Sequence, residues 1–434
     1  MEQDGRRLAR KADKKGYGRV PSRFWYWFGV SATRLAGLLL GVRVHADPAV
    51  RRLRGPAIIL GNHPSYLDPF LAAYACWPLH FNMVAQNDLF RNPVLRFLLG
   101  KLGCIPKVQF RTDTRAIKAM LRVLHRDGML GVFPEGMRSP DGTGLHFEDS
   151  IARTAKKAGA AILVNILHGA YLTWPRWAVK GARLRFGRIH SECRVLYTHE
   201  QIESMSVEEI HAGIREALHF NDYDWQREHR IRFRCRRPAD GLANILHWCP
   251  RCGAELAIRA EGHGIRCSAC GNEGTMDAYG LLSPAGPDDV IPTDPAAWHA
   301  GQKARMAELA ADPAFALECA VPRLRMSDLE GDFQDAGSGH LRVDREGIRY
   351  TGTVNGTEKT LFVRLARLSG FSSDFGKRFE LVVDDVAYRI YPEDGQMVIR
   401  IVDAVEALRE HAQREPEGVS VEAQAQRGMA GTER

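Results

Sequence analysis

Short apolar runs, each closed by turn-forming residues, recur through the first half of the chain. Residues 57–60, 128–133 and 161–164 are almost wholly apolar and only a few residues long, which is typical of buried strands. Between and after them lie helical patterns, such as 117–124 and the segment 206–218, which begins with a capping box of Ser206 and Glu209. Strands that alternate with helices predict an α/β fold with a mostly parallel sheet flanked by helices.

The second half has a different pattern. Residues 281–319 are rich in Pro, Asp, Ala and Gly and are interpreted as a linker. From residue 320 the apolar positions alternate with polar ones in short runs separated by Gly-containing turns, which predicts a small β-rich domain. An amphipathic helix over residues 398–411 follows. Several strands that end in one helix look like a pleckstrin-homology-like module.

These patterns divide the chain into six parts. They are a basic arm with an interface helix (1–50), an α/β domain (51–240), a small cysteine-bearing module (241–280), the linker (281–319), the β-rich domain (320–412) and a polar tail expected to be disordered (413–434).

The net charge of +8 and the basic pI suggest an anionic partner. Residues 1–23 hold eight Lys and Arg, and an aromatic cluster, residues 24–28, opens the apolar segment that follows. A basic arm before an aromatic-rich apolar helix favours an anionic membrane surface, while a core helix remains an alternative. Spanning is disfavoured because Arg34 would cost about 2.5–3.5 kcal/mol at the bilayer centre. We therefore expect a peripheral protein on the cytoplasmic face of the plasma membrane.

A turn with chemistry follows the first apolar run. Gly61 and Asn62 break the strand, His63 comes next, and Asp68-Pro69 reads as a helix start with Asp68 as the N-cap. His63 and Asp68 can meet only if the chain folds back in the turn, which Pro64 promotes by excluding the helical conformation at His63. A histidine held by a carboxylate is a general base for a hydroxyl proton, whereas the alternative is a loop histidine beside a capping aspartate.

A second polar motif lies at the end of another strand. Residues 134–139, Pro-Glu-Gly-Met-Arg-Ser, come directly after the apolar run 128–133. Ligands of open α/β sheets bind outside the carboxyl ends of the strands, so both motifs can face one crevice. Arg138 offers a guanidinium fork for phosphate, and Gly136 permits close approach of a ligand to the backbone.

Together, Asn-His-Pro-Ser-Tyr-Leu-Asp and Phe-Pro-Glu-Gly-Met-Arg-Ser resemble the first and third sequence blocks of the 1-acylglycerol-3-phosphate acyltransferases (lysophospholipid acyltransferases). The resemblance covers residues 20–235. It implies the glycerolipid acyltransferase fold and transfer of an acyl chain from acyl-CoA or acyl carrier protein to a lysophospholipid hydroxyl. It also implies that His63 is the base, that Asp68 orients it, and that Glu135 and Gly136 help to hold the glycerol phosphate.

The family's second block resembles Lys101 to Lys107 here and includes Gly103. That block usually ends in an Arg that binds the acceptor phosphate, but Gln109 occupies the expected place. Lys107 and Arg111 flank it and, with Arg138, are the candidates for the positive charge. The residues 171–177 are interpreted either as an apolar rim for the acyl chain or as a loop packed on the sheet.

Two Cys-x-x-Cys pairs define the small module. Cys249, Cys252, Cys267 and Cys270 are spaced as the ligands of a tetrahedral zinc ion, and Gly253 and Gly271 follow the pairs. Four protein ligands close the coordination sphere, so this zinc is expected to be structural. The total of nine cysteines is odd, which favours a reducing compartment over the disulfide alternative.

The sequence thus predicts a membrane-associated acyltransferase that most simply makes phosphatidic acid from 1-acylglycerol-3-phosphate. The expected partners are the lysophospholipid, the acyl donor and the anionic membrane. Two alternatives remain: an acyltransferase for another lysolipid or an amine-bearing lipid, and a non-catalytic zinc-ribbon protein that binds nucleic acid or a protein partner. Nucleic acid is not expected, because the basic residues cluster before the aromatic helix and aromatic residues beyond Trp248 do not accompany the cysteine pairs.

Overall fold

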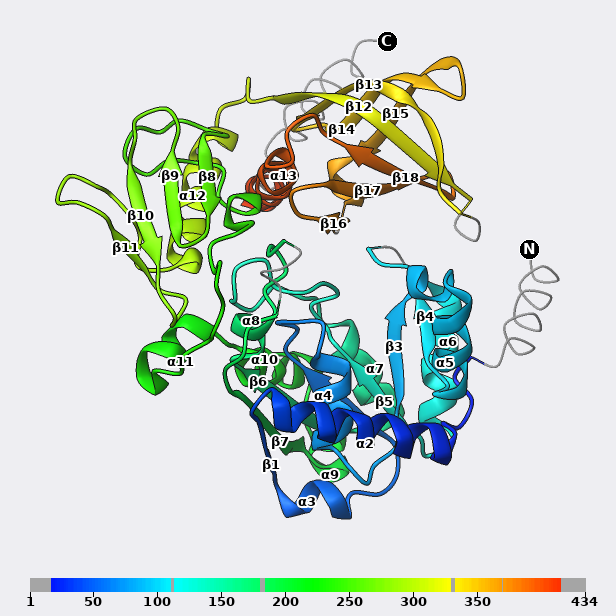
Figure 1. The fold of residues 1–434 in the computed structure, drawn as a ribbon. Helices are drawn as coiled ribbons and strands as arrows, with labels where there is room; N and C mark the ends of the chain where they lie inside the picture. Colours follow the sequence, from blue (N-terminus) through cyan, green and yellow to red (C-terminus); the bar gives the residue numbers. More distant parts are fainter. Residues whose placement is uncertain (1–16, 111–112, 180–183, 329–331, 369, 415–434) are drawn as a thin grey trace, which may run out of the picture. The chain divides into compact units, whose positions relative to one another are not determined.

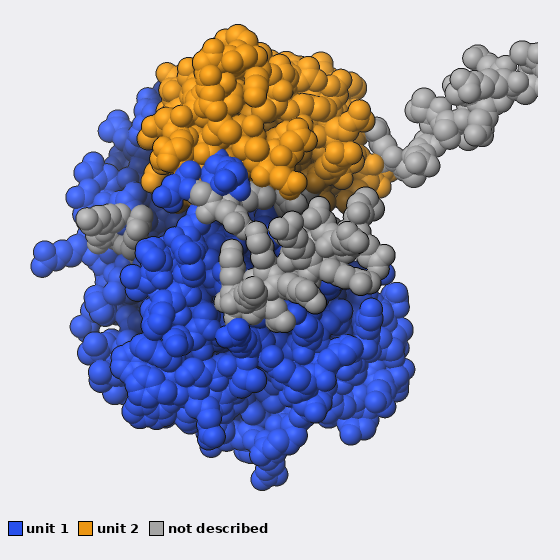
Figure 2. All heavy atoms as spheres, turned by 90° about the vertical axis from the view of Figure 1, so that its right-hand side faces the viewer, with its two compact units in different colours: residues 1–299, 327–332 blue, residues 300–326, 333–434 orange. Residues whose placement is uncertain are grey.

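The structure, a computed structural model, describes residues 17–110, 113–179, 184–328, 332–368 and 370–414. The chain forms two compact units (Figures 1 and 2). Unit 1 comprises residues 1–299 and 327–332, and unit 2 comprises residues 300–326 and 333–434.

A seven-stranded sheet forms the centre of unit 1, with the order β1-β7-β6-β2-β5-β3-β4. All neighbouring strands are parallel except the pair β6 and β7. This confirms the predicted mostly parallel sheet. The strands are, in chain order, β1 (Val42–Ala46), β2 (Ala57–Gly61), β3 (Asn82–Gln86), β4 (Ile105–Lys107), β5 (Met129–Val132), β6 (Ala161–His168) and β7 (Ile189–Tyr197).

Helices cover both faces of this sheet (Figure 1). The helices of this part of the chain are α2 (Arg23–Leu39), α3 (Pro48–Arg52), α4 (Asp68–Ala75), η1 (Asn87–Phe90), α5 (Pro93–Lys101), α6 (Thr114–Leu124), α7 (Ser150–Ala158), α8 (Ala170–Thr173), α9 (His199–Ser204), α10 (Val207–Leu218) and α11 (Asp222–His229). The capping box at the start of α10 has the predicted form, with Ser206 and Glu209 each bonding the other's backbone N–H.

The central strand β2 shows how the two apolar layers arise. All five of its residues are buried. Ile58 and Leu60 point into one layer with α6, α7, α9 and α10, whereas Ala57 and Ile59 point into the other with α2, α3 and α4. A strand buried on both faces reads as a continuous apolar run, which is why this segment lacks alternation. The loop that follows β2 is therefore fixed from both sides of the sheet.

After α11 the chain forms a second, four-stranded sheet. Its order is β11-β10-β9-β8, and its neighbouring strands are antiparallel. The strands are β8 (Ile258–Glu261), β9 (Gly264–Cys267), β10 (Glu273–Met276) and β11 (Leu282–Pro284), and a short helix η2 (Leu242–Asn244) precedes them. The four cysteines lie in and around this sheet, which we call the cysteine module (residues 241–284).

The segment 281–319, expected from its composition to be a linker, is structured instead. It contains β11 and the helix α12 (Pro295–Ala310), which crosses from unit 1 into unit 2. Asp294 accepts a hydrogen bond from the N–H of Ala297 at 2.8 Å, which caps the helix, and Trp298 is 1% exposed. The apolar side chains of α12 are interleaved with polar ones and were hidden by the high Ala and Pro content.

Unit 2 is the predicted β-rich domain. Its seven strands follow the order β15-β14-β13-β12-β18-β17-β16. They are β12 (Leu317–Ser327), β13 (Gln334–Asp344), β14 (Gly347–Val354), β15 (Thr357–Arg364), β16 (Ser372–Asp374), β17 (Arg378–Val383) and β18 (Val386–Tyr391), with η3 (Leu365–Arg367) after β15 and the terminal helix α13 (Met397–Arg414). The likeness to a pleckstrin-homology-like module stays a prediction. Residues 415–434, most of the predicted tail, and residues 1–16, most of the basic arm, lie outside the described residues.

Candidate active site

Three parallel strands end at the same edge of the central sheet. Leu60 of β2 pairs with Val132 of β5, and Gly61 pairs with Asn165 of β6. The loops that leave β2 and β5 at this edge carry the two polar motifs. Carboxyl ends of parallel strands are where open α/β sheets bind ligands. The predicted juxtaposition of the two motifs is thus present.

His63 and Asp68 form a hydrogen-bonded pair in the first of these loops. The His63 Nδ1 atom lies 2.7 Å from Asp68 Oδ2, and the Asp68 side chain is fully buried whereas that of His63 is 18% exposed. Ser65 donates two further bonds to the same carboxylate, from its N–H and its hydroxyl, both at 2.8 Å. Asp68 begins α4 rather than capping it, since Leu67 is the N-cap residue. Its carboxylate accepts hydrogen bonds from His63 and Ser65 within the loop and none from the described residues of the helix's first turn.

The surroundings of His63 favour the neutral imidazole. Burial lowers the pKa of His63, the hydrogen bond and charge of Asp68 raise it, and the charges of Arg138 and Arg176 lower it again. The ring stacks on Phe133, with centroids 4.3 Å apart. Gly61 makes this stack possible, because a Cβ at that position would meet Phe133 Cε1 at 2.9 Å. A neutral ring whose Nδ1 faces a carboxylate leaves Nε2 as the basic atom.

The second motif encloses the backbone of His63. Glu135 Oε1 accepts the N–H of His63 at 2.9 Å, and Glu135 Oε2 accepts the N–H of Leu145 at 2.9 Å. The N–H of Ser139 donates to the carbonyl of His63, also at 2.9 Å. We call residues 133–145 the site loop. Burial raises the pKa of Glu135 to about 8, against the two N–H donors, which lower it. Glu135 thus holds the loop and the base together rather than acting as a free carboxylate.

Two arginines lie beside the base. The guanidinium carbon of Arg138 sits 3.4 Å from the ring centroid of Tyr66, and the Arg138 Nη1 atom is buried without a hydrogen-bond partner among the described residues. Arg176 Nη1 donates to the carbonyl of Arg138 at 3.1 Å. The ring of Trp174 packs on Tyr66 from the other loop, with centroids 5.2 Å apart. The sequence did not predict Arg176 as a site residue, because the segment 171–177 was interpreted from its apolar and aromatic residues alone.

The residues of the predicted second block lie at both ends of β4, and only some of them are near the site. Gly103 precedes β4, at the opposite end of the strand from the site edge, and a Cβ there would meet the carbonyl oxygen of Arg19 at 2.2 Å. Its role is close backbone packing, and the expectation that it binds substrate is not supported. Lys107 ends β4 on the site side, and burial lowers its pKa while Asp113 raises it. Gln109 donates from its side-chain amide to the carbonyl of Gly136. Arg111 lies outside the described residues.

The four cysteines converge as predicted. All their Sγ atoms lie within 4.8 Å of one another, with Cys249 to Cys270 at 3.8 Å and Cys252 to Cys267 at 3.9 Å. Ligands at the usual Zn–S length in a tetrahedron are separated by about 3.8 Å, whereas a disulfide needs about 2.05 Å. The N–H of Gly253 bonds the carbonyl of Cys249, and Gly271 does the same for Cys267. The site fits a tetrahedral metal ion.

The outer surfaces of α2 and α5 are unusually apolar. Large side chains on these two helices are exposed, from 39% for Leu95 to 78% for Leu38 and Leu39. We call this the apolar face, and its members are Phe24, Trp27, Phe28, Leu35, Leu38, Leu39, Val94, Leu95 and Phe97. Trp25 joins the two helices by an edge contact with Phe97, at 5.7 Å between centroids. The six members on α2 recur at helical spacing and share one side of that helix. None of the described helices is both long and apolar enough to cross a bilayer.

Comparison with known proteins finds a family likeness in the central domain. Residues 41–166 match the sequence profile of the family described as Acyltransferase. The matched segment includes both site motifs and the strands β1 to β5 with most of β6. This segment of the chain is therefore similar to the Acyltransferase family.

The curated relatives carry a more specific name than the family profile. The chain is 31% identical over 115 residues to a 1-acyl-sn-glycerol-3-phosphate acyltransferase of Borreliella burgdorferi, covering 26% of this chain and 45% of that protein. It is 27% identical over 118 residues to the chloroplastic enzyme LPAT1 of Arabidopsis thaliana (26% and 32%), and 30% identical over 125 residues to the enzyme of Limnanthes alba (27% and 43%). The chain thus spans less than half the length of these relatives.

A solved structure was also matched. It is the crystal structure of the 1-acyl-sn-glycerophosphate acyltransferase PlsC from Thermotoga maritima, with a TM-score of 0.37 and 20% identity, covering 44% of this chain and 76% of that one.

Proposed function

We propose that this protein transfers an acyl chain from an acyl-CoA or acyl carrier protein thioester to the free hydroxyl of 1-acylglycerol-3-phosphate, giving phosphatidic acid. The observation that carries the proposal is the His63–Asp68 pair, with its 2.7 Å contact, next to a loop that Glu135 holds to the backbone of His63 and that carries Gly136 and Arg138. The names of the curated relatives support the same reaction.

In this reaction His63 acts as the general base. Asp68 accepts a hydrogen bond from the Nδ1–H of His63 and so fixes the tautomer in which Nε2 takes the hydroxyl proton of the acceptor. The acceptor oxygen attacks the thioester carbonyl, the carbon–sulfur bond breaks, and the proton held by His63 passes to the leaving thiolate. The sequence has no Gly-x-Ser-x-Gly nucleophile motif, so the transfer is a single displacement without an acyl-enzyme.

The acceptor phosphate is bound by Arg138 together with Arg176. Arg138 has a buried Nη1 without a described partner, and Arg176 bonds the Arg138 carbonyl, so two guanidinium groups belong to one corner of the site. Guanidinium forks are suited to phosphate. Arg176 thus takes the part that the second-block arginine plays in the family, a position held here by neutral Gln109. Gly136, which is exposed and has a φ of +73°, leaves the loop open to the glycerol.

An acyl-transfer assay of the full chain tests the proposal. The acceptors are 1-acylglycerol-3-phosphate, a panel of other lysolipids and an amine-bearing lipid, each tried with acyl-CoA and with acyl carrier protein. We expect 1-acylglycerol-3-phosphate to be preferred. His63→Ala should lower the rate by about 10²–10⁴. His146→Ala, which changes a histidine 69% exposed in the same domain, is the matched control. Preference for another acceptor would reassign the substrate, and no transfer to any acceptor would end the proposal.

We further propose that the cysteine module binds one structural zinc ion through Cys249, Cys252, Cys267 and Cys270. Two pairs of thiols at tetrahedral spacing, each followed by a left-handed glycine with a φ of +74°, support this. The metal would hold the module together and would not take part in acyl transfer, since four protein ligands leave no open position.

The apolar face is proposed to dock on the cytoplasmic surface of the plasma membrane, where the lysolipid acceptor lies. Its aromatic and aliphatic side chains would enter the interface, and the basic arm before α2 would add attraction to anionic lipids. Because burial of apolar area is not screened by salt, whereas the attraction of the arm is, the two contributions can be separated experimentally.

A further inference from the structure

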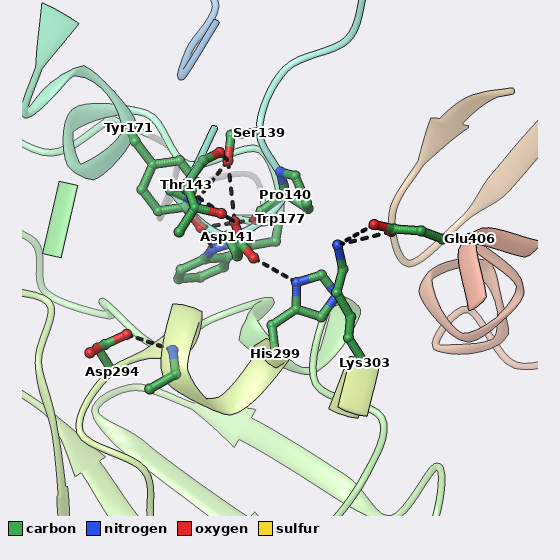
Figure 3. A network of polar contacts seen from close by, with 12 residues as sticks. Ser139, Pro140, Asp141, Thr143, Tyr171, Trp177, Asp294, His299, Lys303 and Glu406 are labelled. Atoms are coloured by element: carbon green, nitrogen blue, oxygen red, sulfur yellow. Dashed lines mark hydrogen bonds and ion pairs between the residues drawn. The ribbon is translucent and has the colours of Figure 1, made fainter. Parts of the chain in front are cut away.

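The site loop is held from outside the acyltransferase domain. His299, on α12, is fully buried, and its Nδ1 lies 2.7 Å from Oδ2 of Asp141, near the end of the site loop (Figure 3). The two residues are 158 positions apart in the chain, and His299 lies far beyond the segment that matches the Acyltransferase profile. Both belong to unit 1.

Asp141 uses its other oxygen to order the loop itself. Its Oδ1 accepts the N–H and the hydroxyl of Thr143, at 3.0 and 2.8 Å (Figure 3). The hydroxyl of Ser139 lies 3.3 Å from the same Oδ1 and donates its proton to the carbonyl of Thr143 at 2.6 Å. Ser139 is the residue whose N–H donates to the carbonyl of His63. A line of hydrogen bonds therefore runs from His299 through Asp141, Thr143 and Ser139 to the backbone of the base.

The first turn of α12 is independently fixed, so His299 is a firm support. Asp294 caps the helix and is ion-paired with Arg227 of α11. The indole N–H of Trp298 donates to the carbonyl of Trp248 at 2.9 Å. A side chain in a packed helix loses little further freedom when it makes a hydrogen bond, and this makes it an effective anchor for a loop.

We propose that His299 is a positioning residue for acyl transfer: through its bond to Asp141 it sets the conformation of the site loop and thereby the placement of Gly136 and Arg138 on the acceptor. His299 acts through Asp141 and touches no reacting atom. The inference rests on the proposed function for its kinetic consequence, but the ordering of the loop can be measured without any activity.

Three variants of His299 in the full chain separate hydrogen bonding from packing. The amide N–H of His299→Asn lies where Nδ1 lies in histidine, so it can still donate to Asp141. The amide N–H of His299→Gln lies near the position of Nε2, and His299→Ala has no donor. Trp298→Phe is the matched structural control. It changes the residue next to His299 and removes the indole hydrogen bond to the carbonyl of Trp248, but it leaves the bond between His299 and Asp141 in place.

The loss of a hydrogen bond to a charged group predicts an acceptor KM raised about tenfold or more in His299→Ala and His299→Gln. The acyl-donor KM should change less than about twofold, and His299→Asn should restore most of the acceptor KM. Hydrogen exchange at the amides of residues 139–145 should be faster in the Ala and Gln variants only. Thermal unfolding of each variant is measured alongside.

Three results would overturn the inference. The first is an unchanged acceptor KM and unchanged loop exchange in His299→Ala. The second is a His299→Asn variant that behaves like His299→Ala, because the donor atom would then be irrelevant. The third is an equal rise of both KM values that Trp298→Phe reproduces, which is the sign of general loss of structure. If the wild type transfers no acyl group, the proposed function fails, and the exchange experiment still decides whether His299 orders the loop.

Discussion

The carboxylate of Asp68 offers the most direct test of the site, because replacement by Asn or by Ala separates its charge from its hydrogen bonds. Oδ2 accepts from His63 Nδ1 and from the N–H of Ser65, and Oδ1 accepts from the Ser65 hydroxyl. In Asp68→Asn the amide oxygen can take the place of Oδ2 and keep its two donors. The amide nitrogen then faces the hydroxyl of Ser65, which can accept as well as donate.

The two variants should therefore differ in stability. Asp68 is fully buried, and Asp68→Ala removes the acceptor for three donors. An unsatisfied buried donor costs about 1–3 kcal/mol, and local rearrangement recovers part of the sum, so we expect the free energy of unfolding to fall by about 2–4 kcal/mol. Asp68→Asn keeps the pattern and should cost about 1 kcal/mol or less.

The variants should be alike in catalysis. Both remove the negative charge that stabilises the imidazolium formed when His63 takes the proton. Asp68 also raises the pKa of His63 against burial, so its loss makes the base weaker. A decrease of about 10²–10⁴ in kcat is expected for each variant.

Urea unfolding and acyl-transfer kinetics on the same preparations measure both quantities. A full rate in Asp68→Asn would mean that the charge has no catalytic part and that Asp68 only shapes the loop. Equal losses of stability in the two variants would show that the amide cannot satisfy the donors, and the hydrogen-bond argument would be refuted.

Three further predictions concern pH, metal and membrane. Burial raises the pKa of Glu135 to about 8 from an ordinary 4.5, so between these pH values the folded protein keeps a proton that the unfolded chain releases. This contribution to the free energy of unfolding is complete below pH 4.5 and is lost as the pH rises to 8, by at most about 1.4 kcal/mol per pH unit. Urea titrations from about pH 5 to 9 should therefore show a flatter dependence of stability on pH in Glu135→Gln than in the wild type. Metal analysis of the reduced protein should find about one zinc ion per chain, and Cys252→Ser should lose it. When a chelator removes the zinc, hydrogen exchange should become faster in residues 249–270. A wild-type protein without metal would contradict the proposed site. The double variant Trp27→Ser, Leu38→Ser should bind anionic vesicles at least about tenfold more weakly than the wild type in flotation assays at high salt. The reason is that each of the two side chains contributes about 1.5–3 kcal/mol when it is buried in the membrane. Unchanged vesicle binding would mean that another part of the chain is the anchor.

Local patterns in the sequence predicted the parts of the site that depend on neighbouring residues. The apolar run of β2, its Gly61-Asn62 turn and the Pro64 that follows indicated that His63 and Asp68 could meet, with a loop histidine beside a capping aspartate as the alternative. The two side chains do meet, at 2.7 Å. The cysteine spacing was equally informative, because the geometry of a knuckle is set within four residues. In both cases the interacting groups lie within one turn or one hairpin.

Arg176 and His299 could not be found in this way, because each reaches the site from a separate element. Their contacts depend on how α12 and the segment 171–177 pack, and no periodicity in the sequence reports such packing. One signal was present for the helix. Asp294-Pro295 repeats the Asp-Pro pair that opens α4, and Asp294 does cap α12. The composition of residues 281–319 outweighed that signal in the interpretation as a linker.

The contacts of Trp177, the residue next to Arg176, connect the α/β domain to the cysteine module. The indole N–H of Trp177 donates to the hydroxyl of Tyr171, and the Trp177 carbonyl accepts from Asn244, at the edge of the cysteine module. Buried Arg185 lies over the Trp177 ring and bonds the carbonyl of Pro238. The residue next to Arg176 is thus tied to the module through Asn244, while Arg185 and Pro238 hold it from within the α/β domain. The module and α12 then serve one physical purpose: each fixes one of the two loops that carry the proposed phosphate ligands, Arg176 on one and Arg138 on the other.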